Sequence, residues 1–352
     1  MRRALAVLLS LMLATTGVAA QAAQVKTDKP SAEAFKAKKS TSKAKAKAKT
    51  SKASAKASSA KKQKVVRVLP ARPSEGMQAG LHKTQDSLDL KSSVALVVDQ
   101  DTNEILFQKN SDAVLPIASI TKLMTALVTV EARLSLDEEL LVSAAERVPE
   151  SARSKLQPGV KVTRAQAMHM ALMSSDNRAA HLLGRTYPGG LDAFVEAMNA
   201  KAKLLGMSES RFAEPTGLSI DNRSSAGDLV RLATAAYQHE VIRDYSTTAQ
   251  ADMQVGKRMV KFGSTNRLTA DPRWDIGLQK TGYTSAAGRC LVMQTVIEGQ
   301  RVMMVLLDSV GKFSRLGDAQ RIRTWLEAKH QRGSGKAAGF DLGGAAVAAS
   351  SL

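Results

Sequence analysis

Three short motifs follow one another in this chain: Ser119-Ile120-Thr121-Lys122, then Ser175-Asp176-Asn177, then Lys280-Thr281-Gly282. The first places a lysine one helical turn after a serine, so that both side chains share one face of a helix. Together the motifs supply a nucleophile, an amine base and further polar groups for acyl transfer without histidine. The fold must therefore bring three distant segments to one cleft.

Each motif is weak evidence alone, because the same short patterns arise by chance. The Ser-x-x-Lys spacing recurs several times before residue 72 and again at Ser309 with Lys312. Only Ser119 combines this spacing with an apolar-periodic helix that begins near Pro116 and follows two predicted strands. This context selects Ser119 as the predicted nucleophile and Lys122 as its base, provided that burial lowers the pKa of the amine.

The second motif is predicted to lie between two helices, where its side chains can project into a cleft. We expect Ser175 to relay a proton to the leaving nitrogen and the Asn177 amide to hold a substrate carbonyl group. Ordinary helix capping is the alternative reading of such a cluster. A rival match at Ser264-Thr265-Asn266 lies close to the third motif in sequence, so we prefer Ser175.

The third motif ends a predicted strand that could pair with an extended peptide. Gly282 removes the Cβ atom that would block a close approach. Lys280 and Thr281 offer a charge and a hydroxyl group to a substrate carboxylate or carbonyl. The backbone N–H groups of Ser119 and Tyr283 are the predicted oxyanion hole.

The periodicities predict an α+β fold in which an antiparallel sheet is flanked by helices, with an all-helical insertion forming the far wall of a cleft. The expected strands are 93–100, 104–108, 291–297 and 301–307. The expected helices are 165–173, 178–183, 191–205, 226–238 and a closing helix over 318–330.

Both ends of the chain differ from the middle in composition. Residues 1–22 have two arginines, an apolar run and small residues, which predicts a secretory signal peptide; an uncleaved anchor is the alternative. Residues 23–78 form a Lys/Ala/Ser-rich tail that we expect to be disordered, and residues 333–352 form a Gly/Ala-rich end with the same expectation. The remaining segment, 79–332, is the predicted catalytic domain.

Most of the positive charge lies in the tail. Residues 26–72 hold sixteen Lys and Arg against two acidic residues, whereas the whole chain has a net charge of +19. Export argues against nucleic acid and favours an acidic envelope polymer or a lipid surface as the partner. A solvated spacer without specific affinity is the alternative.

The region from Leu88 to His330 resembles the low-molecular-mass penicillin-binding proteins, the D-alanyl-D-alanine peptidases. Besides the three motifs, Glu214-Pro215-Thr216-Gly217-Leu218 and Lys280-Thr281-Gly282-Tyr283-Thr284 are similar to that family. The resemblance implies a DD-peptidase/β-lactamase-like fold, an acyl-enzyme on Ser119, β-lactam binding, and peptidoglycan cross-linked peptides as substrates.

The short C-terminal part resembles periplasmic D-alanyl-D-alanine endopeptidases, which cut cross-links, and carboxypeptidase activity is the alternative. A β-lactamase is disfavoured because Glu214 is the only carboxylate near the spacing of a deacylating base, in the wrong sequence context. A wall-binding scaffold with weak or no catalysis is a further alternative. The five histidines are scattered and no phosphate-binding loop occurs, so we expect neither a metal nor a cofactor.

Overall fold

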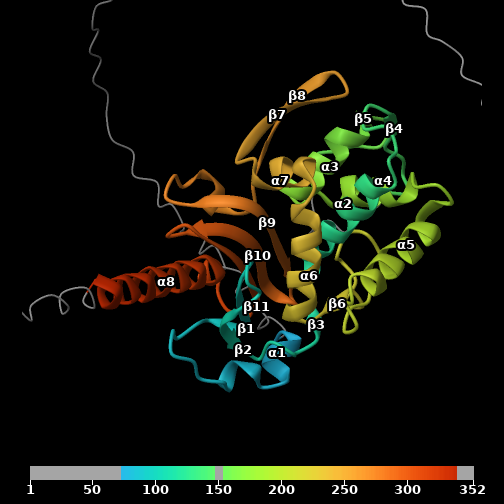
Figure 1. The fold of residues 1–352 in the computed structure, drawn as a ribbon. Coiled ribbons are helices and arrows are strands. Elements are labelled where there is room, and N and C mark those ends of the chain that lie inside the picture. The colour runs from blue at the N-terminus through green and yellow to red at the C-terminus, as the bar shows by residue number, and fades with distance from the viewer. Residues whose placement is uncertain (1–72, 147–153, 339–352) are drawn as a thin grey trace, which may run out of the picture. The chain divides into compact units, whose positions relative to one another are not determined.

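The computed structural model describes residues 73–146 and 154–338. Its centre is a five-stranded antiparallel sheet with the strand order β2-β1-β11-β10-β9 (Figure 1). The strands are β1 (Ser92–Asp99), β2 (Ile105–Lys109), β9 (Asp275–Thr284), β10 (Gly288–Ile297) and β11 (Gln300–Ser309). β9 lies at one edge of this sheet.

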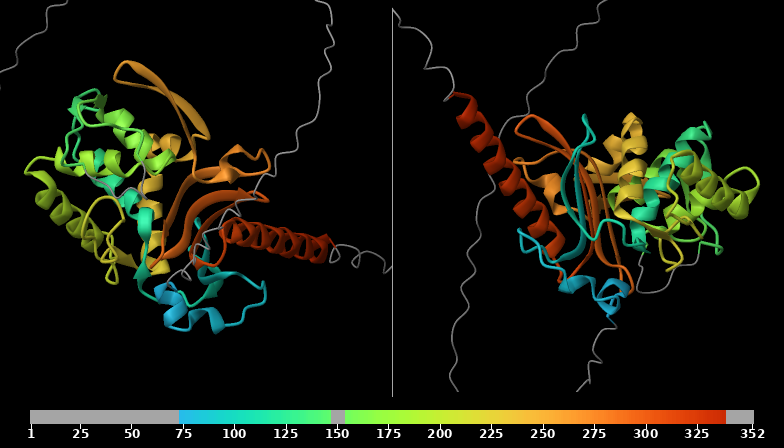
Figure 2. Two further views of the ribbon diagram at one scale, coloured as in Figure 1. Left: turned by 180° about the vertical axis from the view of Figure 1, so that it is seen from behind. Right: turned by 60° about the horizontal axis from the view of Figure 1, so that its bottom comes forward.

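Both faces of the sheet are covered, which explains why all eight residues of β1 are buried. Successive strand residues point to opposite faces, so Val94 belongs to one apolar core and Ala95 to the other. Helix α8 (Ser314–Ala338) covers the face of Ala95, and α6 (Ala226–Tyr237) packs against the other face (Figure 2).

A mainly helical part, which also holds the short strand pair β4–β5, lies next to α6 (Figure 1). Its helices are α2 (Lys122–Glu131), α3 (Arg164–Met173), α4 (Asn177–Arg185) and α5 (Gly190–Leu204). Local signals fix their starts: Thr163 and Gln166 form a capping box at α3, and Asp176 accepts a hydrogen bond from the Ala179 N–H at α4.

Three small two-stranded antiparallel sheets lie outside the central sheet in the described part of the chain. They pair β3 (Leu115–Pro116) with β6 (Arg223–Ser224), β4 (Glu139–Leu141) with β5 (Lys161–Thr163), and β7 (Gln250–Val255) with β8 (Arg258–Gly263). The sequence patterns did not predict the β7–β8 hairpin or helix α7 (Glu240–Thr247). Within the described ranges, no helix is both long and apolar enough to cross a membrane.

The predicted α+β fold is confirmed, but two boundaries need correction. Helix α1 (Glu75–Gln78) lies inside the segment that we assigned to the tail. Tertiary packing holds it: Gly76 is buried, and its backbone passes so close to Asp308 that a Cβ atom there would lie 2.2 Å from a carboxylate oxygen. Helix α8 continues to Ala338, beyond the expected end at His330, because an internal glycine costs a helix only about 1 kcal/mol.

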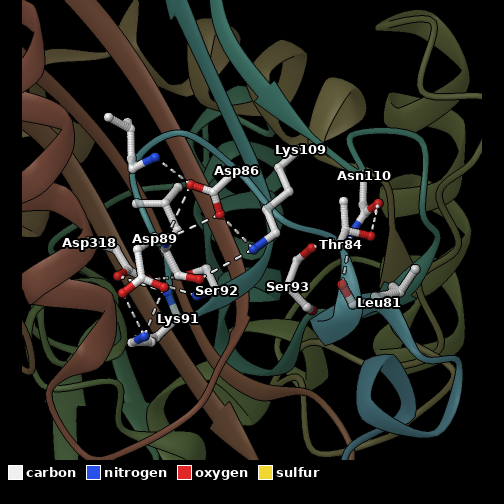
Figure 3. Close-up of polar contacts among 12 residues, drawn as sticks. Leu81, Thr84, Asp86, Asp89, Lys91, Ser92, Ser93, Lys109, Asn110 and Asp318 are labelled. Atoms are coloured by element: carbon white, nitrogen blue, oxygen red, sulfur yellow. Dashed lines mark hydrogen bonds and ion pairs between the residues drawn. The ribbon is translucent and has the colours of Figure 1, made fainter.

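Residues 81–91 are attached to the sheet by a polar network in addition to the apolar packing of Leu81, Leu88 and Leu90 (Figure 3). The Lys109 amine reaches Asp86 at 2.9 Å, and Asp86 also accepts the Leu90 N–H. Asp318 of α8 accepts the N–H groups of Lys91 and Ser92. These groups satisfy one another, so the network is structural.

The predictions of a signal peptide, a Lys-rich tail and a disordered C-terminus concern residues 1–72 and 339–352 for the most part, and these residues lie outside the described ranges.

Candidate active site

Ser119 lies in a tight turn rather than in a regular α-helix. The 3-10 turn η2 (Ala118–Thr121) precedes α2, which begins at Lys122. Ala118 has a φ of 47°, a conformation that L-residues seldom adopt. Such strain persists only where surrounding structure imposes it, and it is common where a side chain must be presented to a cleft. Ser119 is partly exposed and lines the cavity described below.

Lys122 is fully buried, and its amine has three partners. The nitrogen lies 2.9 Å from Ser119 Oγ and donates to Asn177 Oδ1 at 2.7 Å and to the Thr216 carbonyl oxygen at 2.5 Å. Burial lowers the pKa of this amine to about 7, although the carboxylates of Glu214 and Asp176 oppose the shift. A neutral lysine near pH 7 can accept a proton.

The second motif joins the two lysines. Ser175 lies between α3 and α4 in a left-handed conformation, with a φ of 60°, and its Oγ is 2.9 Å from Lys280 Nζ. Asn177 is the first residue of α4 and contacts Lys122. The pair therefore links the helical wall to both the nucleophile's turn and the sheet edge.

The third motif lies within β9, not at the end of a strand as we predicted. Lys280 is fully buried and does not line the cavity; its amine contacts Ser175 Oγ and the Thr281 carbonyl. Burial, followed by the charges of Lys122 and Arg315, moves its pKa well below the usual lysine value. Its amine is thus available to Ser175 rather than directly to a ligand.

Gly282 comes very close to the nucleophile's turn. A Cβ atom at this position would lie 2.9 Å from the Ile117 carbonyl oxygen and 3.1 Å from the Ser119 nitrogen. Only glycine allows β9 to approach this turn without a shift. The approach brings β9 at Gly282 next to the backbone nitrogen of Ser119, one of the two N–H groups predicted for the oxyanion hole.

A loop that sequence reasoning did not assign to the site supports the same turn. Glu214 accepts the N–H groups of Thr216 and Gly217, both at 2.6 Å, and so presents the Thr216 carbonyl to Lys122. Gly217 has a φ of 83°, and a Cβ atom there would lie 2.0 Å from the Ala118 carbonyl oxygen. Glu214 therefore holds a loop in place, which argues against a role as deacylating base.

These parts enclose a cavity of about 520 Å³. All three motifs contribute to its lining, together with Leu218, Thr265, Tyr283, Thr284, Ser285, Arg289 and Arg315. From the rival motif only Thr265 reaches it, with its hydroxyl 2.6 Å from that of Thr281. Asn266 is buried, and its side-chain oxygen accepts the Leu268 N–H. Ser175 lines the cavity and Ser264 does not.

Arg315 is the main polar group of the cavity that the sequence analysis missed. Its side chain is only 8% exposed, its Nε has no hydrogen-bond partner, and Nη1 reaches just the Lys312 carbonyl at 3.3 Å. Burial and nearby Arg289 lower the pKa of the guanidinium. A buried cation without a carboxylate partner is costly, so it marks a place for an anionic group of a ligand. No sequence signal distinguishes this arginine from its neighbours.

Among the described residues, no three His, Cys, Asp or Glu side chains are grouped closely enough to hold a metal ion. The groups that are present can instead perform acyl transfer. They place a serine beside a lysine of lowered pKa, a second serine beside a second lysine, and strand β9 against the backbone of the nucleophile's turn.

Comparison with known proteins agrees with this chemistry. Residues 81–311 match the family model of the S11 peptidases, described as D-alanyl-D-alanine carboxypeptidase. The chain belongs to this family of serine D-alanyl-D-alanine peptidases. Relatives named D-alanyl-D-alanine endopeptidase, from Escherichia coli and Pseudomonas aeruginosa, are 43% and 45% identical; the alignments cover 74% and 71% of this chain and 84% and 81% of theirs.

Solved structures of similar proteins include the Streptomyces K15 DD-transpeptidase, with a TM-score of 0.64 and 25% identity over 69% of this DD-peptidase and 98% of that chain. Penicillin-binding protein D2 from Listeria monocytogenes, in its ampicillin-bound form, has a TM-score of 0.60 and 29% identity over 67% and 97% of the two chains. The fold and the family expected from the motifs are thereby confirmed.

Proposed function

We propose that this protein is a D-alanyl-D-alanine endopeptidase that hydrolyses peptide cross-links of peptidoglycan through an acyl-enzyme on Ser119. The contact between Lys122 and Ser119 carries the acyl-enzyme part of the proposal, because it joins a nucleophile to an amine whose pKa is lowered to about 7, so that a large fraction of it is neutral at that pH. The Escherichia coli and Pseudomonas aeruginosa relatives, named endopeptidases and aligned over most of their length, support the preference for cross-links.

In the proposed mechanism, Lys122 takes the hydroxyl proton as Ser119 Oγ attacks the carbonyl carbon of the scissile D-alanine. The oxyanion accepts hydrogen bonds from the N–H groups of Ser119 and Tyr283. Ser175, held by Lys280, relays this proton from the Lys122 ammonium to the leaving nitrogen, so that the C–N bond breaks and Lys122 is neutral again. A water molecule then attacks the ester and releases the peptide and the Ser119 hydroxyl.

The same cavity offers a path for the peptide. β9 has one neighbour in the sheet, β10, so its other edge can pair with an extended substrate. Asn177 and Thr281 line this edge and supply amide and hydroxyl groups. We assign Arg315 to the carboxylate of the leaving residue, because both a terminal D-alanine and a cross-linking residue carry a free carboxylate there.

A mixture of a cross-linked muropeptide dimer and a monomeric pentapeptide tests the proposal, with products followed by mass spectrometry. We expect the wild-type protein to convert the dimer to monomers and penicillin to prevent this reaction. Loss of only the terminal D-alanine would identify a carboxypeptidase, which is the activity named in the description of the family model. No reaction on either substrate would contradict both assignments.

We also propose that residues 1–22 direct export to the periplasm and that residues 26–72 bind an acidic envelope polymer or lipid surface through their net charge of +14. Sedimentation of the mature protein with purified peptidoglycan sacculi, and separately with anionic vesicles, tests the second part. Binding should disappear on deletion of 26–72; binding that survives the deletion would contradict this assignment.

A further inference from the structure

Four cationic side chains lie together at the Arg315 end of the cavity. Arg315 and Arg289 line it, the Arg315 guanidinium bonds to the Lys312 carbonyl, and Lys312 lies 5.4 Å from the centre of the Phe313 ring. Arg267, from the turn η4 (Arg267–Ala270), lies 4.7 Å from the same ring. We call these four cations, with the exposed rings of Tyr283 and Phe313, the cationic rim.

The cations of the rim have no acidic partners within the described ranges. Other arginines on the neighbouring elements do: Arg273 pairs with Asp271, Arg321 with Asp318, and Arg323 with Glu327. Arg267, Arg289 and Lys312 instead contact aromatic rings, as Arg289 does at 4.2 Å above Tyr283. Arg315 bonds only to the Lys312 carbonyl within these ranges. Unpaired cations gathered at one mouth of a cleft attract anionic ligands and leave their charge available to them.

The position of the rim indicates which part of a substrate it meets. Arg315 is assigned to the carboxylate of the leaving residue of the substrate. Protein groups that lie beyond Arg315 therefore face the part of the substrate that follows the leaving residue. In a monomeric pentapeptide the leaving D-alanine ends there. In a cross-link the leaving residue continues through its side chain into a second stem peptide, which carries further carboxylates and aliphatic groups.

We propose that the cationic rim binds the second stem peptide of the cross-link, with Arg267 and Lys312 receiving its carboxylates and Phe313 and Tyr283 its aliphatic groups. This inference rests on the proposed endopeptidase function and gives it a structural basis. The rim favours a cross-linked dimer over a pentapeptide because only the dimer reaches Arg267 and Lys312. Charge-assisted contacts of this kind weaken as salt increases.

The test compares two double variants of equal charge. Arg267→Gln with Lys312→Gln removes two rim cations that do not line the cavity. Lys203→Gln with Lys257→Gln removes two exposed cations from α5 and the β7–β8 turn. We expect the ratio of kcat/KM for the dimer to that for the pentapeptide to fall roughly tenfold in the rim variant only. An unchanged ratio in the rim variant would overturn the inference.

Binding measurements in a Ser119→Ala background separate this inference from the proposed function. Without the nucleophile, titration calorimetry with dimer and with pentapeptide should show tighter binding of the dimer, and the rim substitutions should remove the difference. Equal affinities in the unsubstituted background would reject the rim as a stem-binding surface. If the dimer binds more tightly through the rim but the wild-type protein does not cleave it, the rim would remain a stem-binding surface and the proposed endopeptidase activity would be rejected.

Discussion

Lys122 Nζ lies 2.9 Å from Ser119 Oγ, and the other two partners of this nitrogen, Asn177 Oδ1 and the Thr216 carbonyl, are oxygens that can only accept. A neutral amine has two N–H groups and one lone pair. Both N–H groups are used by the two carbonyl oxygens, so the lone pair is left for the Ser119 hydroxyl proton. The local hydrogen bonds thus orient the base as well as hold it.

The first prediction concerns pH. Because Lys122 must be neutral to accept the proton and its pKa is lowered to about 7, acylation should be slow below this value and level off above it. The measurement is the second-order rate constant of labelling by fluorescent penicillin, from about pH 5 to about pH 9, so that both sides of the pKa are sampled. A rate that falls as pH rises through this range would exclude neutral Lys122 as the base.

Removal of the Ser119 hydroxyl and removal of the Lys122 amine should have different effects on acylation. Ser119→Ala should abolish covalent labelling, whereas Lys122→Ala should retain the nucleophile and slow acylation by about 10²- to 10⁴-fold. Circular dichroism checks that both variants fold. Labelling of Ser119→Ala at unchanged stoichiometry, or near-normal acylation of Lys122→Ala, would refute the corresponding role.

Gly282→Ala tests the close approach of β9 to the nucleophile. The added Cβ atom would displace the backbone that forms the proposed oxyanion hole, and we expect acylation to slow by roughly 10²-fold. Gly263→Ala is the matched control, since the nearest atom to its added Cβ is 3.8 Å away. Equal rates in the two variants would show that the contact has no catalytic importance.

Arg315→Gln should weaken recognition of the substrate carboxylate. We expect kcat/KM for a pentapeptide to fall about 10- to 100-fold, the range for a lost hydrogen bond to a charged group. A pentapeptide amidated at its C-terminus provides the control, because it lacks the carboxylate and should react equally with both proteins. An identical loss on both peptides would assign Arg315 to structure instead.

Ser175 and Ser264 allow a direct comparison of the two Ser-x-Asn matches. Ser175→Ala removes the hydroxyl next to Lys280 and should strongly slow turnover, whereas Ser264 does not line the cavity and Ser264→Ala should have little effect. Steady-state hydrolysis of the pentapeptide gives the readout. The opposite ranking would mean that the wrong pair was chosen.

Much of this site could be predicted because its residues occur in short motifs with local structural signals. The apolar period after Ser119 and the cap at Asp176 are readable from neighbouring residues. Gly217 meets Ala118, and Arg315 lines a cavity formed by distant segments. Glu214 bonds to its own loop and affects Lys122 only through the Thr216 carbonyl. No local pattern identifies such relationships. Helix α7 and the β7–β8 hairpin escaped prediction because their short, mixed patterns fit several structures.

The two glycines at the nucleophile's turn also limit which residues can stand at their positions. Gly217 touches this turn from the helical side and Gly282 from the sheet side, each at a distance that leaves no room for a methyl group. The nucleophile's turn is thus held between two backbone segments in direct contact with it. A larger residue at either glycine would therefore shift the backbone that carries Ser119, so both positions are closed to side chains even though neither glycine takes part in the chemistry.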